Sequence, residues 1–297
     1  MKRLFFVLFA LAALPAAAAL NVFATVPEWA ALAQEIGGDK VKATTATTAL
    51  QDPHRIDARP SLIARARNAD LLIATGAELE VGWLPVVQRE SGNPRIQAGQ
   101  AGYFEAAEHV RMLEIPARLD RADGDVHAAG NPHIQTDPRN LLKVGAALAL
   151  RMAQLDAGNA AAYRAGYAAF AERWRGHLAR WEKQAAPLKG VAVVSQHQAW
   201  PYLYDWLGLR EVGTLEPKPG IEPSVAQLAR IRDQAANTRP RMVIRAAYNA
   251  ARPAEWFAAE AKVPVVVLPF TVGGTPEASD LTALFETTVQ RLLKPLE

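Results

Sequence analysis

The sequence predicts an α/β protein of two lobes, each a parallel sheet wrapped by helices, joined by one long rigid helix. Two observations support the lobes. Apolar or β-branched runs alternate with helical patterns over residues 20–77, and the same alternation returns over residues 190–296. A third observation concerns residues 159–186, where aromatic and aliphatic side chains recur at spacings of three and four. That spacing is typical of one long helix, which could tie both lobes together.

The first half of the chain has the order strand, helix, strand, helix, strand. We expect strands at residues 20–26, 41–50 and 70–77, with helices at 27–38 and 59–69. Gly37 and Gly38 end the first helix, because glycine commonly terminates helices. Ser61 is placed to cap the second helix. This order is that of a parallel sheet wrapped by helices.

The second half repeats the pattern without repeating the sequence. We expect strands at residues 190–195, 241–248 and 263–270, and helices at 199–208, 222–236, 253–262 and 279–296. Pro223 and Ser224 are typical of a helix start. The expected organisation is an N-terminal lobe at 20–158, a linking helix at 159–186 and a C-terminal lobe at 187–297.

Residues 1–19 have the pattern of a cleavable signal peptide. Lys2 and Arg3 precede a short apolar run, and Ala17 and Ala19 form an Ala-x-Ala cleavage pattern. The apolar run is too short to span a bilayer comfortably. Removal of 19 of the 297 residues would leave 278, a length that suits two lobes. The sequence therefore predicts export.

Composition restricts the partners and the compartment. Without Lys2 and Arg3, 31 of the 33 basic residues remain against 30 acidic ones, which gives no support for a nucleic acid or an anionic membrane as partner. The chain has no cysteine, so it carries neither disulfides nor a lipid on an N-terminal cysteine. We therefore expect a free monomer in the periplasm of a Gram-negative cell.

Three of the six histidines follow the expected strands or precede a helix, in polar loops. They are His54 in "QDPHRID", His133 in "GNPHIQTDP" and His197 in "SQHQAW". In open α/β sheets, ligands bind beyond the carboxyl ends of the strands. Three neutral histidines with one open position suit Zn²⁺. A histidine of this kind taken alone is more often a solvated loop residue or a helix cap than a metal ligand, and no self-contained metal motif such as HExxH is present.

The chain also resembles the solute-binding proteins of bacterial zinc and manganese ABC importers. The matching segments occur in the family's order and cover nearly the whole mature chain: "DPHRIDARPSLIARARNADLLIATGAELE", "GNPHIQTDPRN", "SQHQAWPYLYDWLGL" and "EPKPGIEPSVAQL". The resemblance implies two α/β lobes joined by a rigid helix, with a metal ion in the cleft between them. It places His54, His133 and His197 on the family's histidine ligands.

One position departs from this family. Its members usually supply a fourth ligand, an aspartate, at the end of the strand that is "VPVVVLPF" here, where this chain has Pro269 or Phe270. Neither side chain binds a metal. We expect water as the fourth ligand, with Asp280 second and His127 third. Asp280 would have to leave a helix start that it stabilises, and ordering the loop around His127 costs conformational entropy.

The function implied is capture of Zn²⁺, as transported ligand, and delivery to an ABC permease in the inner membrane. A zinc-dependent hydrolase is the first alternative, because three histidines with an open position are also a catalytic arrangement. We expect no enzyme, because no carboxylate near the histidines in sequence is evident as a general base. A protein of the same fold that binds Mn²⁺ or another ligand is the second alternative.

Overall fold

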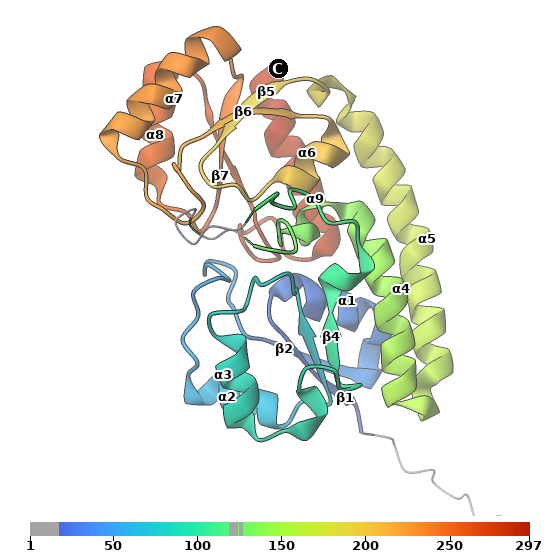
Figure 1. Cartoon of the computed structure of the whole chain (residues 1–297). Helices are drawn as coiled ribbons and strands as arrows, with labels where there is room; N and C mark the ends of the chain where they lie inside the picture. Colours follow the sequence, from blue (N-terminus) through green and yellow to red (C-terminus); the bar gives the residue numbers. More distant parts are fainter. Residues whose placement is uncertain (1–17, 119–123, 125–126) are drawn as a thin grey trace, which may run out of the picture.

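The computed structural model describes residues 18–118, 124 and 127–297, and folds them into two α/β lobes (Figure 1). The signal peptide expected at residues 1–19 therefore lies almost entirely outside the described residues. The N-terminal lobe has four parallel strands in the order β2-β1-β3-β4. Its elements are β1 (Leu20–Ala24), α1 (Pro27–Gly37), β2 (Val41–Thr45), α2 (Pro60–Arg67), β3 (Leu71–Ala74), α3 (Leu84–Ser91) and β4 (Tyr103–Glu105).

The C-terminal lobe repeats this architecture with strand order β6-β5-β7-β8, again all parallel. Its elements are β5 (Ala192–Ser195), α6 (Pro201–Leu207), β6 (Arg210–Thr214), α7 (Val225–Thr238), β7 (Met242–Ala246), α8 (Ala251–Ala261), β8 (Val265–Leu268) and α9 (Leu281–Leu293). Two α/β lobes with parallel sheets were expected from the sequence, and this fold class is confirmed.

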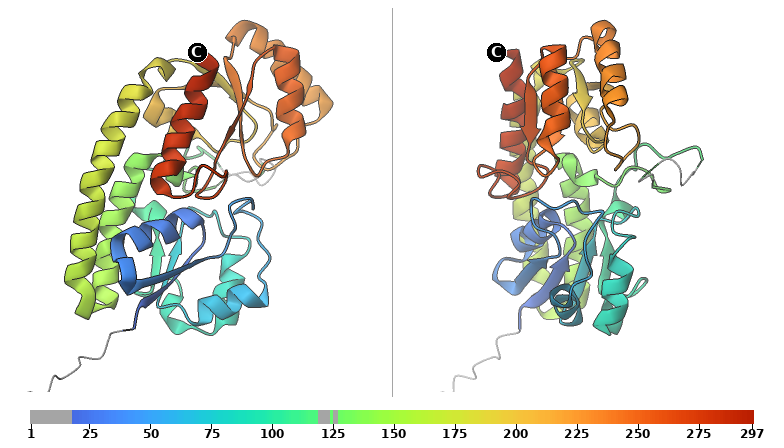
Figure 2. Two further views of the ribbon diagram at one scale, coloured as in Figure 1. Left: turned by 180° about the vertical axis from the view of Figure 1, so that it is seen from behind. Right: turned by 90° about the vertical axis from the view of Figure 1, so that its left-hand side faces the viewer.

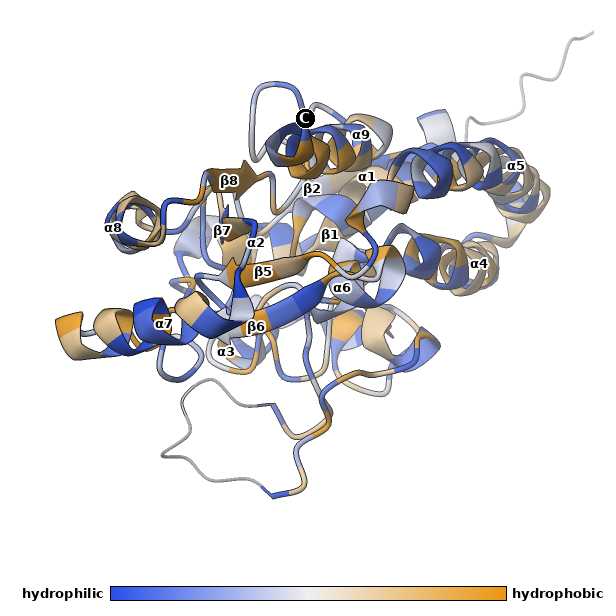
Figure 3. Cartoon of the chain, turned by 90° about the horizontal axis from the view of Figure 1, so that it is seen from above, coloured by the Kyte–Doolittle hydropathy of each residue, from blue (hydrophilic) through white to orange (hydrophobic). Residues whose placement is uncertain are grey.

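Three short elements, α3, β4 and β6, were not predicted from the sequence. Both strands lie at sheet edges, where one side of the strand has no partner. β4 has only three residues, and β6 is the polar segment "REVGT", which is largely hydrophilic in Figure 3. Such edge strands lack the apolar run that identifies a central strand. The expected capping role of Ser61 was wrong, because Pro60 is already the first residue of α2 and Ser61 lies inside the helix.

Two helices run along the back of the molecule, α4 (Pro138–Leu155) and α5 (Ala160–Gln184). The long helix α5 passes both lobes (Figures 1 and 2). At 25 residues it is about 37 Å long. Its buried stripe includes Trp174 and Trp181, whose rings pack on Phe285 of α9. One continuous hydrophobic cluster runs from β3 past α5 to β8, so the lobes share a core on this side.

The two glycines of α5 occupy different environments. A Cβ atom at Gly166 would lie 2.0 Å from the carbonyl oxygen of Ile36, so this glycine allows α5 to approach α1 closely. Gly176 is exposed, and a Cβ atom there would meet nothing within 4 Å. Only Gly166 is therefore required by packing.

Near the histidines the lobes meet through polar groups. Glu28, in the first turn of α1, is fully buried against Thr271 of the loop that follows β8. Burial raises the pKa of Glu28 to about 7, and the Thr271 hydroxyl offsets only part of that rise. Glu28 therefore holds a proton under conditions in which an exposed glutamate has lost it.

We predict opposite effects of alanine at the two glycines. Gly166→Ala will destabilise the protein by about 1–3 kcal/mol, because the new methyl group forces α5 away from α1. Gly176→Ala will stabilise it by about 0.5–1 kcal/mol, because alanine loses less backbone entropy in an exposed helix. Urea unfolding of both metal-free variants measures the difference. Equal effects of the two substitutions would contradict the close approach at Gly166.

We also predict that Glu28 makes metal-free stability depend on pH. Between pH 4.5 and about 7 the folded state keeps a proton that the unfolded state releases, so stability falls as pH rises. A rise from 4.5 to about 7, at roughly 1.4 kcal/mol per pH unit, corresponds to about 3 kcal/mol. Glu28→Gln, which stays neutral, will lack this loss. Parallel stability curves for the two proteins would show that Glu28 does not titrate in the fold.

Candidate metal centre

Three histidines from distant parts of the sequence meet between the lobes. His54 lies in the loop after β2, His133 precedes α4, and His197 follows β5. Each offers a ring nitrogen, and these nitrogens all lie within 4.8 Å of one another. Around a tetrahedral zinc ion, ligand nitrogens are roughly 3.3 Å apart, so a small inward movement would bring these three to that spacing. The expected triad is thus brought together by the fold.

The triad is shielded from water. His133 and His197 are buried, and His54 is half-buried. The pKa of His133 is held well below 6.5, first by burial and then by the neighbouring His54, His197 and His127. A histidine must be neutral to bind a metal, so this environment keeps His133 in the competent form.

Two carboxylates contact the Nδ1 atoms of His54 and His197 and orient these two rings. Asp52 Oδ1 lies 2.8 Å from His54 Nδ1, and Glu216 Oε2 lies 2.7 Å from His197 Nδ1. Burial is the largest influence on the pKa of Asp52 and raises it, but the hydrogen bonds and charge of His54, together with the charge of His197, outweigh burial and hold that pKa below its usual value. Each pair fixes the ring orientation and leaves Nε2 as the nitrogen available to a metal.

These contacts correct the sequence analysis, which found no carboxylate tied to a histidine. Asp52, two residues before His54, was detectable from its spacing, whereas Glu216 is joined to His197 only by the fold. Because both carboxylates bind Nδ1, they serve as orienting groups of the kind found behind metal ligands. Asp137 caps α4 and pairs with Arg139, so it makes no contact of this kind with His133.

His133 is positioned by its backbone. Its N–H donates to Asn131 Oδ1 at 3.0 Å, and Asn131 Nδ2 donates to the Gln198 carbonyl at 2.9 Å. The Tyr202 hydroxyl donates to the Asn131 carbonyl at 2.8 Å. Asn131 therefore fastens the His133 loop to the segment that carries His197. Sequence reasoning missed this residue, because an asparagine in a Gly/Pro-rich loop gives no signal of its own.

Phe270 closes one side of the triad. Its ring packs edge-on against His133 at 5.3 Å between centroids, and also against Trp200 and Tyr248. The side chain is 5% exposed. The position where the resemblance implies a carboxylate is thus an aromatic wall, which offers no ligand atom.

The two weaker candidates for a fourth ligand are placed differently. Asp280 caps α9, with Oδ1 accepting from the Ala283 N–H at 2.8 Å. The His127 ring stacks on His54 at 5.4 Å between centroids. Ala128, the next residue, donates its N–H to Glu78 Oε2 at 2.6 Å. His127 therefore borders the triad, although it is not one of the grouped ligands.

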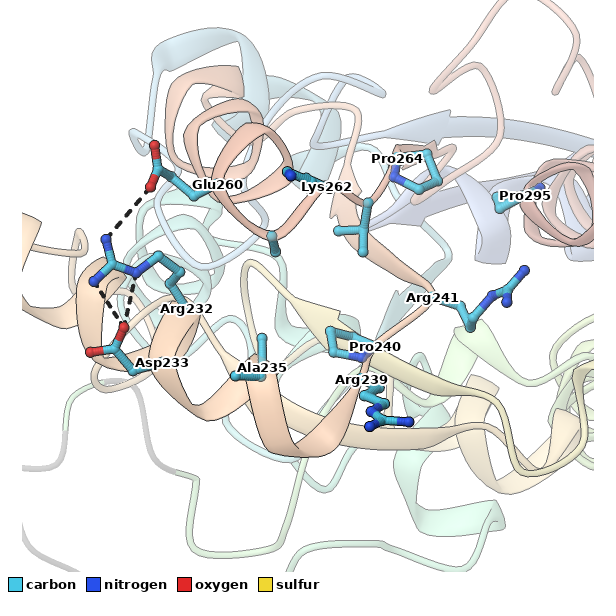
Figure 4. Close-up of a pocket in the computed structure, with 13 residues that line it drawn as sticks. Arg232, Asp233, Ala235, Arg239, Pro240, Arg241, Glu260, Lys262, Pro264 and Pro295 are labelled. Atoms are coloured by element: carbon cyan, nitrogen blue, oxygen red, sulfur yellow. Dashed lines mark hydrogen bonds and ion pairs between the residues drawn. The ribbon is translucent and has the colours of Figure 1, made fainter.

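A larger hollow lies elsewhere on the C-terminal lobe. It encloses about 670 Å³ and is lined by residues that include Arg232, Arg239, Arg241 and Lys262 (Figure 4). Arg241 directly precedes β7 and Lys262 lies just before β8, so this hollow is at the amino ends of the strands, opposite the triad. Beside the triad, the cavity lined by Pro53, Gln135 and Phe270 has only about 10 Å³ free, room for about one water.

Within the described residues, no helix combines the length and apolar character needed to cross a membrane.

Comparisons with known proteins agree with this fold. A family model described as "Zinc-uptake complex component A periplasmic" matches residues 22–294. The high-affinity zinc uptake system protein ZnuA of Paracoccus denitrificans is 26% identical over 259 residues, covering 76% of each chain. The manganese ABC transporter substrate-binding lipoprotein PsaA of Streptococcus pneumoniae is 21% identical over 259 residues, covering 85% of this chain and 80% of that protein.

Solved structures show the same fold. A crystal structure of ZnuA matches with a TM-score of 0.78 at 21% identity, and covers 94% of this chain and 100% of that one. The Mn-bound periplasmic metal binding protein from Candidatus Liberibacter asiaticus matches with a TM-score of 0.76 at 17% identity, covering 93% and 99%. With a family model that spans almost the whole described chain, the protein belongs to the zinc-uptake component A family, the metal-binding solute-binding proteins of ABC importers, and is not an enzyme.

Proposed function

We propose that this protein captures Zn²⁺ in the periplasm and delivers it to an ABC permease in the inner membrane. Residues 1–19 act as the signal peptide that directs export, and the mature chain works as a monomer. The ion is the transported cargo, held between the lobes by His54, His133 and His197.

The observation that carries this proposal is a group of three imidazole nitrogens that, among the residues the structure describes, includes no carboxylate oxygen as a further ligand atom. Imidazole suits zinc, whereas carboxylate and water suit the harder manganese ion. Asp52 and Glu216 stand behind His54 and His197 and bring two negative charges, which match the double charge of the ion. A buried metal ion is stabilised only when groups of opposite charge lie close to it. Mn²⁺ is the second candidate, because PsaA is named as a manganese transporter component.

For the fourth position we propose water. Phe270 supplies no ligand atom, and Asp280 is engaged at the start of α9. The order of the two protein alternatives changes from the one expected from the sequence. His127 stands before Asp280, because its ring already lies against His54 and needs no helix cap to be broken.

We predict one tight Zn²⁺ per chain and much weaker Mn²⁺ binding. Alanine at His54, His133 or His197 will each weaken zinc binding by at least about a hundredfold, because one of three ligands is lost. His109→Ala and His177→Ala are the matched controls and will leave affinity unchanged. Competitive titration against a chelator measures all five proteins. Equal affinity for Zn²⁺ and Mn²⁺ would overturn the zinc assignment.

The same titration separates the candidates for the fourth ligand. His127→Ala and Asp280→Ala will each change zinc affinity less than about threefold if water fills the position, since a factor of three is under 1 kcal/mol. A loss of about a hundredfold in either variant, with the circular dichroism spectrum unchanged, would identify that residue as the ligand instead of water.

We predict that Phe270→Asp shifts selectivity toward Mn²⁺. The new carboxylate adds a hard oxygen donor beside His133, so the ratio of zinc to manganese affinity will fall by about tenfold or more. Phe270→Leu opens the same wall without adding an oxygen and serves as the control, with the ratio unchanged. If Phe270→Leu lowers the ratio as much as Phe270→Asp, packing rather than ligand chemistry sets selectivity.

A further inference from the structure

One hydrogen bond joins the loop of His54 directly to the opposite lobe. Arg55, the residue after His54, donates from Nη2 to the carbonyl oxygen of Gly220 at 3.1 Å. Gly220 lies in the segment between β6 and α7, residues 215–224. The donor and the acceptor are thus 165 residues apart in the sequence.

The same peptide reaches the other side of the triad. The Gly220 N–H donates to Glu216 Oε2 at 2.8 Å, and this oxygen is also the one that lies 2.7 Å from His197 Nδ1. A single carboxylate oxygen therefore holds both the Gly220 backbone and the His197 ring. If Gly220 moves, the Glu216 carboxylate loses one of the two groups that hold it in place, and with it the fixed position from which it orients His197.

The backbone of Gly220 makes this double contact possible. Its φ of +75° is in the left-handed region that favours glycine. Gly124 also lies close to this segment, because a Cβ atom at Gly124 would lie 2.5 Å from the carbonyl oxygen of Pro219. Two residues of the N-terminal half of the chain, Arg55 and Gly124, thus lie against the 215–224 segment.

We propose that Arg55 is a positioning residue, which acts through Gly220 and Glu216 to hold His197 in its metal-binding orientation and so slows release of the ion. This proposal rests on the proposed function. In this proposal two movements are coupled. When the His54 loop approaches the C-terminal lobe, His197 is turned into its metal-binding orientation. The hydrogen bond to Gly220 is exposed, and such a bond contributes modestly to fold stability, so we expect its loss to change metal release more than folding.

The direction in which the rate of zinc release changes when Arg55 is removed distinguishes positioning from simple charge repulsion. Arg55 is a cation next to a ligand of a cation. If it acted only through its charge, its removal would relieve repulsion and slow zinc release. Positioning predicts the opposite result, which is faster release after removal.

The test measures zinc release into excess chelator and the visible absorption spectrum of the Co²⁺-loaded protein, which reports ligand geometry. Arg55→Ala will release zinc about tenfold faster and change the Co²⁺ spectrum, the size expected for loss of a group that orients a ligand. Arg55→Lys keeps the charge and one donor and will be intermediate. Gly220→Ala, strained at positive φ, will resemble Arg55→Ala.

Arg65→Ala is the matched control. Arg65 also donates to a backbone carbonyl, that of Thr45 at 2.7 Å, but within one lobe. The Arg65→Ala substitution will leave both the rate of zinc release and the Co²⁺ spectrum unchanged. Release from Arg55→Ala that is slower than, or within twofold of, the parent protein overturns the proposal, and so does an equal change in Arg65→Ala. If the three histidine variants keep their zinc affinity, the proposed function fails instead.

Discussion

The packing of both lobes against α5 is the constraint on which the metal centre depends. Trp174 and Trp181 lie in a cluster that continues into each sheet, so the two lobes share one core along this helix. Protein interiors are packed as densely as organic crystals. The separation of the two sheets is therefore set along the back of the molecule, and with it the distance between His54 of one lobe and His197 of the other.

The side of the interface that faces the histidines has a different character. There the lobes meet through the hydrogen bonds of Arg55 with Gly220 and of the Asn131 amide with the Gln198 carbonyl. Water can replace polar contacts of this kind at small cost, whereas it cannot replace apolar packing. The physical consequence is that any parting of the lobes should begin at the histidines and leave the contacts of α5 intact.

This arrangement suits a protein that must both hold and release an ion. Asp52 and Glu216 fix two of the three rings and supply negative charge, while Phe270, Trp200 and Tyr248 exclude water from one side. The three histidines of the proposed site come from separate loops of the two lobes, so a small separation of the lobes would part their nitrogens without any covalent chemistry. A hydrolase would instead need a base directed at a metal-bound water, and both carboxylates bind the far nitrogens of the histidines.

The sequence by itself determined the class of fold, the central strands and most of the helices, and the family resemblance of their loops singled out the three histidines that meet. Apolar runs, helix caps and glycine stops are local features, and Asp137, Ser224 and Asp280 cap their helices as such features require. Apart from Asp52, which lies two residues before His54, only the tertiary structure decided the groups around the triad. Glu216 orients His197, Arg55 reaches Gly220, and Glu28 is buried because segments far apart in sequence are brought together, and no local pattern records that proximity.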